Sequence, residues 1–387
     1  MNFALSDEQE FLREAARGAL GRFNTVEEAR DALEGGTPAD LWPTAVEAGW
    51  TGLLIAEERG GAGLGAMDAM LVFEEIGRVL ASVPLLGHVA ATAVLDAAGE
   101  DELCAALASG DQRAALVAAR PPSEGVEPEW TVDAVKGLHR AHAPEIGDDG
   151  RVTGTVAWVP DAPGADVLVV VGAGGRVALV QAADAGVEAV WRYDATRSLG
   201  HVRLDGAPGR LLTLPDDAAA GAWHLSQVFL GAELLGASDL ALQTSVQYAK
   251  ERFTFGRAIG SYQAVKHQLV EMMRLADNAR SLMYYAGWAA KDRPDEFALA
   301  AAAFRLAAGK AAEYASRAQI SVHGGIGATW EHDAPLFFRR AQLSRRLLGG
   351  TTGAADRVAG ELFAAARAEL SSVPPAAEME GAGPTAA

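Results

Sequence analysis

The sequence contains one cysteine, Cys104, in 387 residues. A single thiol cannot form an intramolecular disulfide, which excludes a small scaffold held together by disulfides. Cys104 lies in a stretch rich in alanine and leucine, where a lone thiol is more often a small core side chain than a nucleophile. The cysteine content therefore indicates a protein of a reducing compartment.

Long apolar runs are missing as well. The longest strongly apolar run lies around Val167 to Val171, whereas a helix that spans a bilayer needs roughly 20 residues. The first residues, Met1 to Glu10, carry acidic side chains where a secretory signal carries basic ones. We therefore expect a cytoplasmic protein that does not bind membranes.

Basic side chains are outnumbered, since 33 Lys and Arg stand against 51 Asp and Glu. The long-range field of such a chain repels nucleic acid and anionic membranes, so neither is expected as a partner. Binding an anionic small molecule would require a local cluster of basic side chains. Four arginines near the C-terminal end form either such a cluster or an ordinary solvated helix face: Arg339, Arg340, Arg345 and Arg346.

The rest of the composition is that of a globular protein, with 50% hydrophobic and 22% charged residues. A chain of 387 residues exceeds the size at which one core usually stops growing, so two or three domains are expected. An N-cap at Ser6, followed by apolar residues at helical spacing, predicts a helix at the start of the chain. The same spacing predicts further helices over 39–47, 66–79 and 88–108. The glycine-rich stretch from Arg59 to Gly65 predicts a turn.

The periodicity changes near Ala114. Short β-type runs, separated by Pro, Gly and Asp clusters, predict an antiparallel β domain because no helix-length segment lies between them. The stretch from Val167 to Gly175 has the look of a strand entering a dinucleotide-binding loop. Because Val177 occupies the third glycine position and another strand follows, a hairpin turn is the favoured interpretation. The predicted strands are 116–118, 152–158, 166–171, 177–181 and 201–204.

Helical spacing returns near Asp216. Long alanine- and leucine-rich segments then predict a bundle of helices over 223–252, 262–291, 295–322 and 333–348. The residues after Leu370 can bury little and are expected to be disordered. The predicted fold class is α+β, with an N-terminal helical domain (1–112), a central antiparallel β domain (113–215), a C-terminal four-helix bundle (216–370) and a disordered tail (371–387).

Two segments in the C-terminal half resemble motifs of one enzyme family. The segment from Arg252 to Gln263 is similar to the R-x-x-F-G-x-x-I-x-x-x-Q motif of acyl-CoA dehydrogenases, and Val322 to Gly327 is similar to their H-G-G-x-G segment. The segment from Trp50 to Gly65 resembles the N-terminal glycine motif of the same family. With the predicted order of helices, strands and helices, the resemblance covers almost the whole chain up to the tail.

The resemblance implies an FAD cofactor, bound in the family by an arginine segment that reaches a cofactor held mainly by the neighbouring subunit. The residue types suit that role, because Arg252 can hold a diphosphate through its planar guanidinium and Phe255 can pack on a flat ring. Capped helix ends with glycine turns are the alternative interpretation. The implied cofactor-binding residues are Arg252, Phe255, Gln263, Gly324, Gly325 and Thr351.

The catalytic carboxylate of the family is absent from its usual positions. In the family this group abstracts the α-proton of the acyl thioester while a hydride passes to the flavin. Alignment on the E-G-T segment places Gly349 at that position, and counting from Gly325 places Leu348 there. The position used by a minority of members is Ser226, followed by Gln227 where arginine is usual. None of these side chains can take up the proton.

Two further family features differ. The T-E-P-x-x-G-S-D stretch should fall near Ala118 to Gly125, where only a proline and a glutamate match, and Ser321 replaces the glutamine before H-G-G. Just beyond the glycine loop, Glu331 and Asp333 could serve as a relocated base, although charged helix-capping residues are commoner. No metal site is expected, because the histidines nearby are not spaced as ligands on a helix.

Three functions remain open. The chain is an acyl-CoA dehydrogenase with a relocated base, a subunit that shares an FAD site with a complete homologue, or a flavin-dependent tailoring oxidoreductase. The segment from Leu348 to Gly353 resembles the L-G-G-x-T-G segment of actinobacterial members that lack the usual glutamate and pair with a complete subunit. The resemblance favours the subunit that shares its FAD site. It implies a homo- or hetero-tetramer that acts on a bulky or steroid-derived acyl-CoA thioester. It also implies that the electrons pass to an electron-transfer acceptor.

Overall fold

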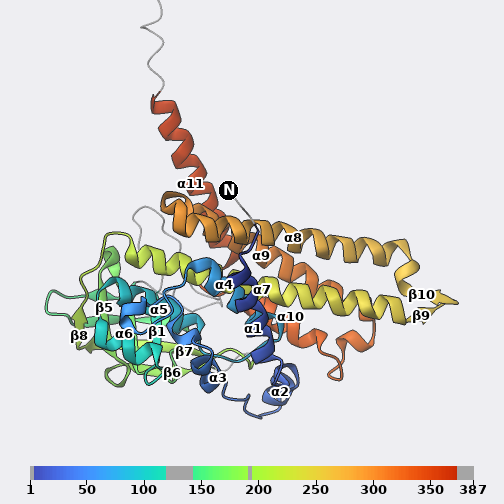
Figure 1. Cartoon of the computed structure of the whole chain (residues 1–387), viewed down its shortest axis with the longest axis horizontal. Coiled ribbons are helices and arrows are strands. Elements are labelled where there is room, and N and C mark those ends of the chain that lie inside the picture. Colours follow the sequence, from blue (N-terminus) through green and yellow to red (C-terminus); the bar gives the residue numbers. More distant parts are fainter. Residues whose placement is uncertain (1–3, 119–142, 191–193, 373–387) are drawn as a thin grey trace, which may run out of the picture.

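The structure is a computed structural model that describes residues 4–118, 143–190 and 194–372. The stretch 119–125, where the degraded T-E-P motif was expected, lies outside the described residues. So do residues 373–387 of the expected tail. The order of helices, then strands, then helices along the chain matches the predicted fold class (Figure 1).

Helices make up the described N-terminal part. The first helix begins where the sequence predicts, because the Ser6 hydroxyl accepts from the backbone N–H of Gln9, whose side chain accepts from the N–H of Ser6. The helix predicted over 88–108 is in fact two helices, since Gly99 adopts a left-handed φ of 71° between them. The helices are α1 (Asp7–Leu20), α2 (Thr25–Leu33), α3 (Trp42–Glu47), α4 (Ala66–Arg78), α5 (Leu86–Ala97) and α6 (Asp101–Ala108).

The described central strands form two four-stranded sheets, β1-β4-β5-β8 and β2-β3-β7-β6. The antiparallel prediction is wrong for one pair, because β1 runs parallel to β4 from Ala114 opposite Val167 to Ala118 opposite Val171. The residues of β4 are all buried, so their pattern marks a central strand but carries no sign of its direction. The strands are β1 (Ala114–Ala118), β2 (Glu145–Ile146), β3 (Val152–Pro160), β4 (Val167–Val171), β5 (Val177–Gln181), β6 (Gly186–Ala189), β7 (Leu199–Ala207) and β8 (Gly209–Leu211).

The glycine-rich segment after β4 is a hairpin turn. Strands β4 and β5 pair antiparallel with Val171 opposite Val177, and the N–H of Gly172 donates to the carbonyl of Arg176 over 2.8 Å. Gly174 and Gly175 both have positive φ, which this turn requires and most residues avoid. The prediction of a hairpin in place of a dinucleotide-binding loop is confirmed.

Long helices form the C-terminal bundle, which extends away from the sheets in Figure 1. A two-stranded hairpin of β9 (Phe253–Thr254) and β10 (Arg257–Ala258) lies at the far end, and α11 projects from the body. By length and composition α7 could cross a membrane, but 78% of its most apolar window is buried in the protein, as in any core helix. The helices are α7 (Ala218–Glu251), α8 (Gln263–Asp292), α9 (Pro294–His323), α10 (Ala334–Ser344) and α11 (Gly350–Ser372).

Helices α4 and α7 cross in direct backbone contact. A Cβ atom added at Gly77 would lie 2.0 Å from the carbonyl oxygen of Glu233, and one added at Gly236 would lie 1.9 Å from that of Glu74. Only glycine allows this approach. The crossing joins the N-terminal helices to the bundle and fixes the position of α7, on which much of the candidate site is built.

A buried ionic network joins the segment before β7 to α7 and α10. The Arg340 guanidinium donates to Asp194 over 2.9 Å and to Glu233 over 3.5 Å, and Arg197 also donates to Glu233. All four side chains are at most 5% exposed. Of the arginines suggested as an anion-binding cluster, Arg340 is thus committed to internal carboxylates, and Arg345 pairs with Glu313 over 2.9 Å.

Candidate active site

One group of predicted cofactor-binding residues gathers where the ends of α7, α8 and α9 meet. Arg252 is the C-cap of α7, Gln263 is the first residue of α8, and Gly324 is the C-cap of α9. Contacts between the helices hold this end together, since the rings of Tyr248 and His323 lie 4.4 Å apart. We call this end of the bundle, with Arg252, Phe255, Gln263, Gly324 and Gly325, the bundle tip.

Phe255 at the bundle tip has an unusual conformation and an unusual exposure. Phe255 and Gly256 connect β9 to β10 with φ values of 49° and 78°, the pattern of a tight hairpin turn with two left-handed residues. A left-handed phenylalanine is strained by roughly 1 kcal/mol or more. The side chain is nevertheless 93% exposed. Its strain is therefore not compensated by packing within this chain, which is typical of residues that meet a ligand or a partner.

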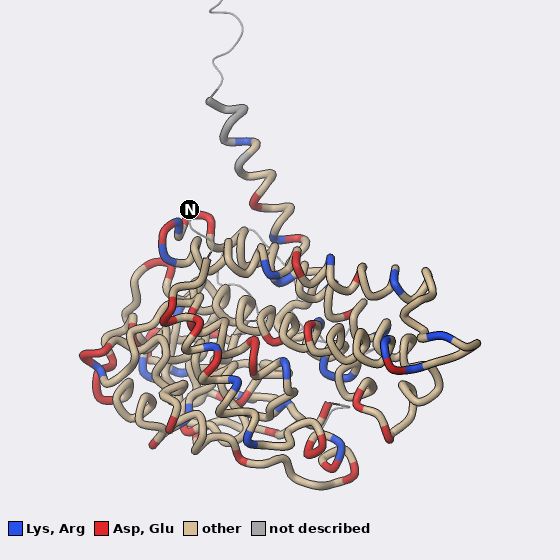
Figure 2. Tube along the Cα trace, turned by 45° about the vertical axis from the view of Figure 1, so that its right-hand side comes forward, with Lys and Arg blue, Asp and Glu red and all other residues tan. Residues whose placement is uncertain are grey.

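The remaining groups at the bundle tip are open to an anion. The exposed Arg252 guanidinium has no hydrogen bond or ion pair to any described residue. Cβ atoms added at Gly324 and Gly325 would have no atom within 4 Å, so a ligand can approach the backbone there. Basic residues lie near this end in Figure 2. An unpaired guanidinium, an exposed aromatic ring and open glycines suit the diphosphate and flat rings of a dinucleotide cofactor.

Thr351 lies elsewhere. A Cβ atom added at Gly309, in the middle of α9, would lie 2.2 Å from the Thr351 Cγ2 atom. At a rise of 1.5 Å per residue, the stretch of α9 from Gly309 to Gly324 measures roughly 20 Å. One chain therefore does not bring all of the predicted cofactor residues together, and Thr351 belongs to a second group.

The loop before Thr351 holds the positions where the family's carboxylate was expected. Leu348, Gly349 and Gly350 are all left-handed, with φ values of 50°, 84° and 65°. Gln227 on α7 donates through Nε2 to the carbonyl of Leu348 over 3.1 Å. We call residues 345–350 the α10–α11 loop. It presents no titratable group at either expected position.

Arg305 of α9 holds the α10–α11 loop in place through backbone carbonyls. Its Nη2 donates to the carbonyl of Ser344 over 2.6 Å and to that of Leu347 over 3.3 Å. The side chain is fully buried and has no carboxylate partner among the described residues, and its Nε and Nη1 atoms have no acceptor there. Burial, reinforced by the nearby charge of Arg197, lowers the pKa of this guanidinium to about 9. The loop is thus fixed by donors from α7 and α9.

The minor base position is also uncharged and already engaged. Ser226 is buried in α7, and its hydroxyl donates to the carbonyl of Ala222 over 3.0 Å. Its neighbour Gln227 holds the loop as described. Neither side chain provides a base.

Glu331 and Asp333 lie at the opposite end of α10 from the α10–α11 loop. Both are exposed, and Asp333 forms an ion pair with Arg30 of α2. The 11 residues of α10 separate them from Gly349 by a helix roughly 16 Å long. The structure therefore does not bring these carboxylates to the expected base position. Within the described residues, no three His, Cys, Asp or Glu side chains are grouped to hold a metal ion.

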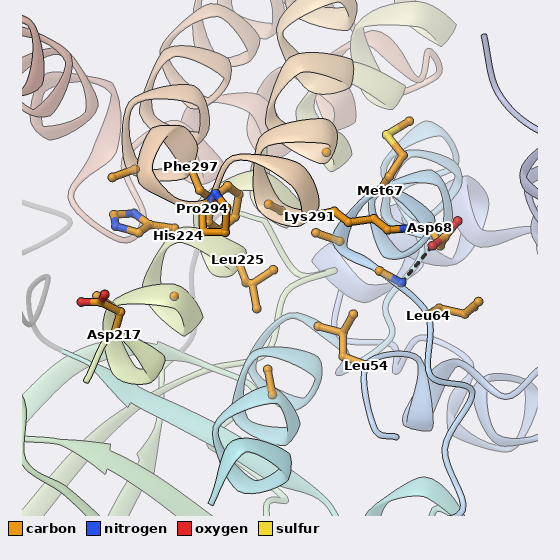
Figure 3. Close-up of a pocket in the computed structure, with 18 of the residues that line it drawn as sticks. Leu54, Leu64, Met67, Asp68, Asp217, His224, Leu225, Lys291, Pro294 and Phe297 are labelled. Carbon is orange, nitrogen blue, oxygen red and sulfur yellow. Dashed lines mark hydrogen bonds between the residues drawn. The ribbon is translucent and has the colours of Figure 1, made fainter. Parts of the chain in front are cut away.

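A large cleft opens beside the bundle, with a volume of about 1120 Å³. Its walls come from the start of α4 and its preceding glycine turn, the start of α7, the junction of α8 and α9, and α11 (Figure 3). Apolar side chains line much of it, and charged groups stand among them. The lining side chains labelled in Figure 3 are Leu54, Leu64, Met67, Asp68, Asp217, His224, Leu225, Lys291, Pro294 and Phe297.

The cleft approaches the α10–α11 loop from the side of α7. His224 and Arg357 line both this cleft and a small cavity that Gln227 and Gly353 also line. Since Gln227 bonds the carbonyl of Leu348, the inner end of the cleft lies about one helical turn from the loop. His224 was not expected from the sequence, because its surroundings come from segments more than 70 residues apart. Only the Arg59 to Gly65 turn, whose last residues line the cleft, was visible as a motif.

Two parts of the chain match profiles of one family. Residues 6–109 match the acyl-CoA dehydrogenase N-terminal domain, and residues 218–361 match the acyl-CoA dehydrogenase C-terminal domain. The acyl-CoA dehydrogenase IpdE2 of Mycolicibacterium smegmatis is 30% identical over 362 residues, which cover 93% of this chain and 100% of the relative.

Solved structures with the same fold include assemblies of two different chains. A chain of the ChsE4-ChsE5 complex from Mycobacterium tuberculosis superposes with a TM-score of 0.79 at 27% identity, covering 97% of this chain and 100% of that chain. A chain of a variant of the Tcur3481-Tcur3483 steroid ACAD gives a TM-score of 0.80 at 27% identity, with coverages of 93% and 99%.

Proposed function

The chain belongs to the acyl-CoA dehydrogenase family, and from this premise we propose that it is a flavoprotein subunit for the α,β-dehydrogenation of an acyl-CoA thioester. In this proposal it shares an FAD site with a homologous subunit that carries the catalytic carboxylate. Its place of action is the cytoplasm.

The observation that carries the proposal is the α10–α11 loop. Dehydrogenation of a thioester requires a base positioned at the α-carbon, and removal of a general base typically costs a factor of about 100 to 10,000 in rate. Gly349 and Leu348 occupy the two expected positions, and donors from Gln227 and Arg305 hold the loop in place. A chain with this loop needs a carboxylate from elsewhere.

The division of the cofactor residues into two groups supports a shared site. Arg252, Phe255 and Gln263 would hold the diphosphate and ring systems of FAD at the bundle tip, with the Gly324–Gly325 backbone closing around them. Thr351 lies roughly 20 Å away along α9 and would meet a different cofactor molecule. When bound, FAD supplies the hydride acceptor. A second chain is then needed to complete each cofactor site.

The chemistry of the partner follows from what this chain lacks. It is a homologue that carries a carboxylate in its own α10–α11 loop, and the assembly is a tetramer. Two structural neighbours at 27% identity are assemblies named for two different chains, which supports a mixed assembly. An external electron-transfer acceptor would take up the electrons that are removed from the thioester.

The 1120 Å³ cleft is the proposed place of the acyl group. Its inner end lies next to the α10–α11 loop, where the reacting carbons of a thioester would have to sit. Its volume exceeds the roughly 300–1,000 Å³ of common small-molecule sites, which suits a bulky acyl group such as a fused-ring system. One neighbour is named a steroid ACAD, consistent with that class.

The two alternatives are not favoured by any observation. A relocated base at Glu331 or Asp333 would act from the far end of α10, and Asp333 is paired with Arg30. A tailoring oxidoreductase of different chemistry would need other reactive groups at the cleft, and the described residues there contain no cysteine and no set of metal ligands.

The proposal is tested by the flavin content of the purified protein. The absorption spectrum of the full chain alone is compared with that of the chain co-expressed with a complete family member. We expect little bound FAD in the chain alone and a full complement in the complex. Stoichiometric FAD in the chain alone would refute the need for a different homologue to complete the cofactor site.

A further inference from the structure

His224 is a polar side chain inside the cleft that has no hydrogen-bonding partner among the described residues. It is 7% exposed and lies on α7 with its ring in edge contact with Phe297, the centroids 5.9 Å apart. Neither ring nitrogen has a hydrogen bond to the described part of the chain. Figure 3 shows the imidazole beside Phe297. Since neither nitrogen is among the fully enclosed polar atoms of the described residues, both remain accessible from the cleft, where a ligand can reach them.

The imidazole is neutral in the folded protein. Burial, together with the nearby charge of Arg357, lowers the pKa of His224 to about 3. A neutral imidazole offers one N–H donor and one nitrogen acceptor. It can therefore bind a hydroxyl group through either nitrogen or a carbonyl oxygen through its N–H.

The charges around the cleft restrict the ligand further. Carboxylates outnumber cations in the lining, with Asp68, Asp217, Asp295 and Glu361 against Lys291 and Arg357. A carboxylate on the ligand would be repelled and would meet an uncharged imidazole. A pure hydrocarbon would leave both ring nitrogens without a partner in a site from which it had displaced water.

We propose that His224 is a specificity-determining residue, which binds a neutral oxygen, a hydroxyl or keto group, on the otherwise apolar acyl part of the substrate. The inference rests on the proposed function, since it assumes that the cleft receives an acyl thioester. It assigns the substrate to the class of oxygen-bearing cyclic acyl-CoA thioesters.

The test compares the binding of matched thioesters to the full chain, because residues of one chain line the cleft. Cyclohexylacetyl-CoA is titrated against its 4-hydroxy and 4-oxo counterparts by isothermal calorimetry. We expect an oxygenated thioester to bind about tenfold more tightly than the plain one, the ratio that one net hydrogen bond to a buried group gives.

His224→Phe keeps an aromatic ring and removes both polar atoms. In this variant the tenfold ratio should fall to about one, while the plain thioester binds at least as tightly as before. His224→Asn, which keeps a donor and an acceptor, should retain part of the preference. If the phenylalanine variant does not fold, His224→Leu provides the same comparison.

Ser226→Ala is the matched control on the same helical turn. Its hydroxyl is bonded within α7 and the residue does not line the cleft, so the preference should persist. A preference that survives in His224→Phe, or is absent in the wild type, overturns the role of His224 alone. Failure of every thioester to bind overturns the acyl site, and the inference with it, whereas the FAD measurement tests the shared cofactor site separately.

Discussion

Asp161 links the end of β3 to the start of α5, and its carboxyl titrates near neutral pH. Its Oδ2 accepts from the backbone N–H of Gly87 over 2.8 Å, and burial raises the pKa of the carboxyl to about 7. The unfolded chain releases this proton near pH 4, whereas the native state keeps it. Asp161 therefore contributes stability that is present at low pH and is lost as the pH rises from about 4 to 7.

Asp161→Asn should remove this contribution and keep an oxygen for the Gly87 N–H. We expect the stability of the variant relative to wild type to rise between pH 4 and pH 7 by about 2–4 kcal/mol, measured by urea unfolding at each pH. His88 and His224 act in the opposite direction, because burial lowers their pKa values to about 4 and about 3, but they are common to both proteins. If the free energies of unfolding of the wild type and of Asp161→Asn changed with pH in parallel, the raised pKa of Asp161 would be contradicted.

Arg252 should hold FAD in the assembled protein. Arg252→Ala is expected to weaken FAD binding by about 1.5–3 kcal/mol, the usual value of a hydrogen bond to a charged group. Lys250→Ala removes a neighbouring exposed cation at the end of α7 and should have a much smaller effect. Fluorescence titration with FAD measures both. Equal losses in the two variants would mean that only the general charge of the bundle tip matters.

Single residues differ in how far the sequence reveals them. Arg252, Phe255 and Gln263 stand in one contiguous motif, so their place at a helix end followed from local pattern alone. Their role as cofactor ligands stays a prediction. His224, Arg305 and Asp161 owe their properties to burial by segments far away in the sequence. No local pattern distinguishes these three from ordinary polar residues.

The α10–α11 loop is an element whose backbone, as well as its sequence, disfavours a carboxylate. Gly349 has a φ of 84°, and a side chain there would cost roughly 1–2 kcal/mol. We expect Gly349→Glu to lower stability by about that amount and to restore at most a small part of the flavin reduction by a thioester. Gly349→Ala has the same backbone strain without a carboxyl and is the control.

Unfolding measurements on both variants check the backbone cost, and stopped-flow flavin reduction checks the chemistry. If Gly349→Glu is as stable as the wild type and its flavin is rapidly reduced by a thioester without a partner, the missing carboxylate is the only defect of the loop. The loop would then not be a constrained element.

The ionic network that joins α7 to α10 should be intolerant of single deletions. Glu233→Ala would leave the buried cations Arg197 and Arg340 with less compensation, so we expect a loss of about 3–5 kcal/mol. Glu271→Ala breaks an exposed pair with Arg274, which solvent screens, and should have a much smaller effect on stability. Chemical denaturation measures both. Similar losses of unfolding free energy in the two variants would show that burial adds little to the contribution of the network to stability.

At the level of helices and strands, periodicity located the predicted elements, but the sequence analysis predicted neither α2 nor the long helix α11. It did not reveal the break at Gly99, because alanine-rich sequence continues across it, nor the direction of β1 relative to β4. Strand direction depends on how distant segments return to a sheet, and a fully apolar strand carries no mark of it. The division into domains at residues 112, 215 and 370 stays a prediction.

The whole molecule has the fold of the family, with Leu348 and Gly349 at the positions where the sequence comparison expects a carboxylate. The resemblance in the Arg252 and His323 segments led from sequence to family, and the profile matches and the IpdE2 relative confirm it. The proposed shared site and partner could not be derived in the same way, because they involve a second chain. The proposed substrate class could not either, because the cleft is lined by segments far apart in the sequence. In the proposed assembly, another chain would supply half of the site.

The most direct test of the central claim is rapid-mixing measurement of flavin reduction by acyl-CoA thioesters. The panel includes short, medium and steroid-derived thioesters, presented first to the FAD-supplemented chain alone and then to the chain co-expressed with a complete homologue. We predict slow or undetectable reduction by the chain alone and rapid reduction by the complex, because only the partner supplies a carboxylate at the expected base position. Rapid reduction by the chain alone would contradict the account and would make Glu331 and Asp333 the next residues to substitute.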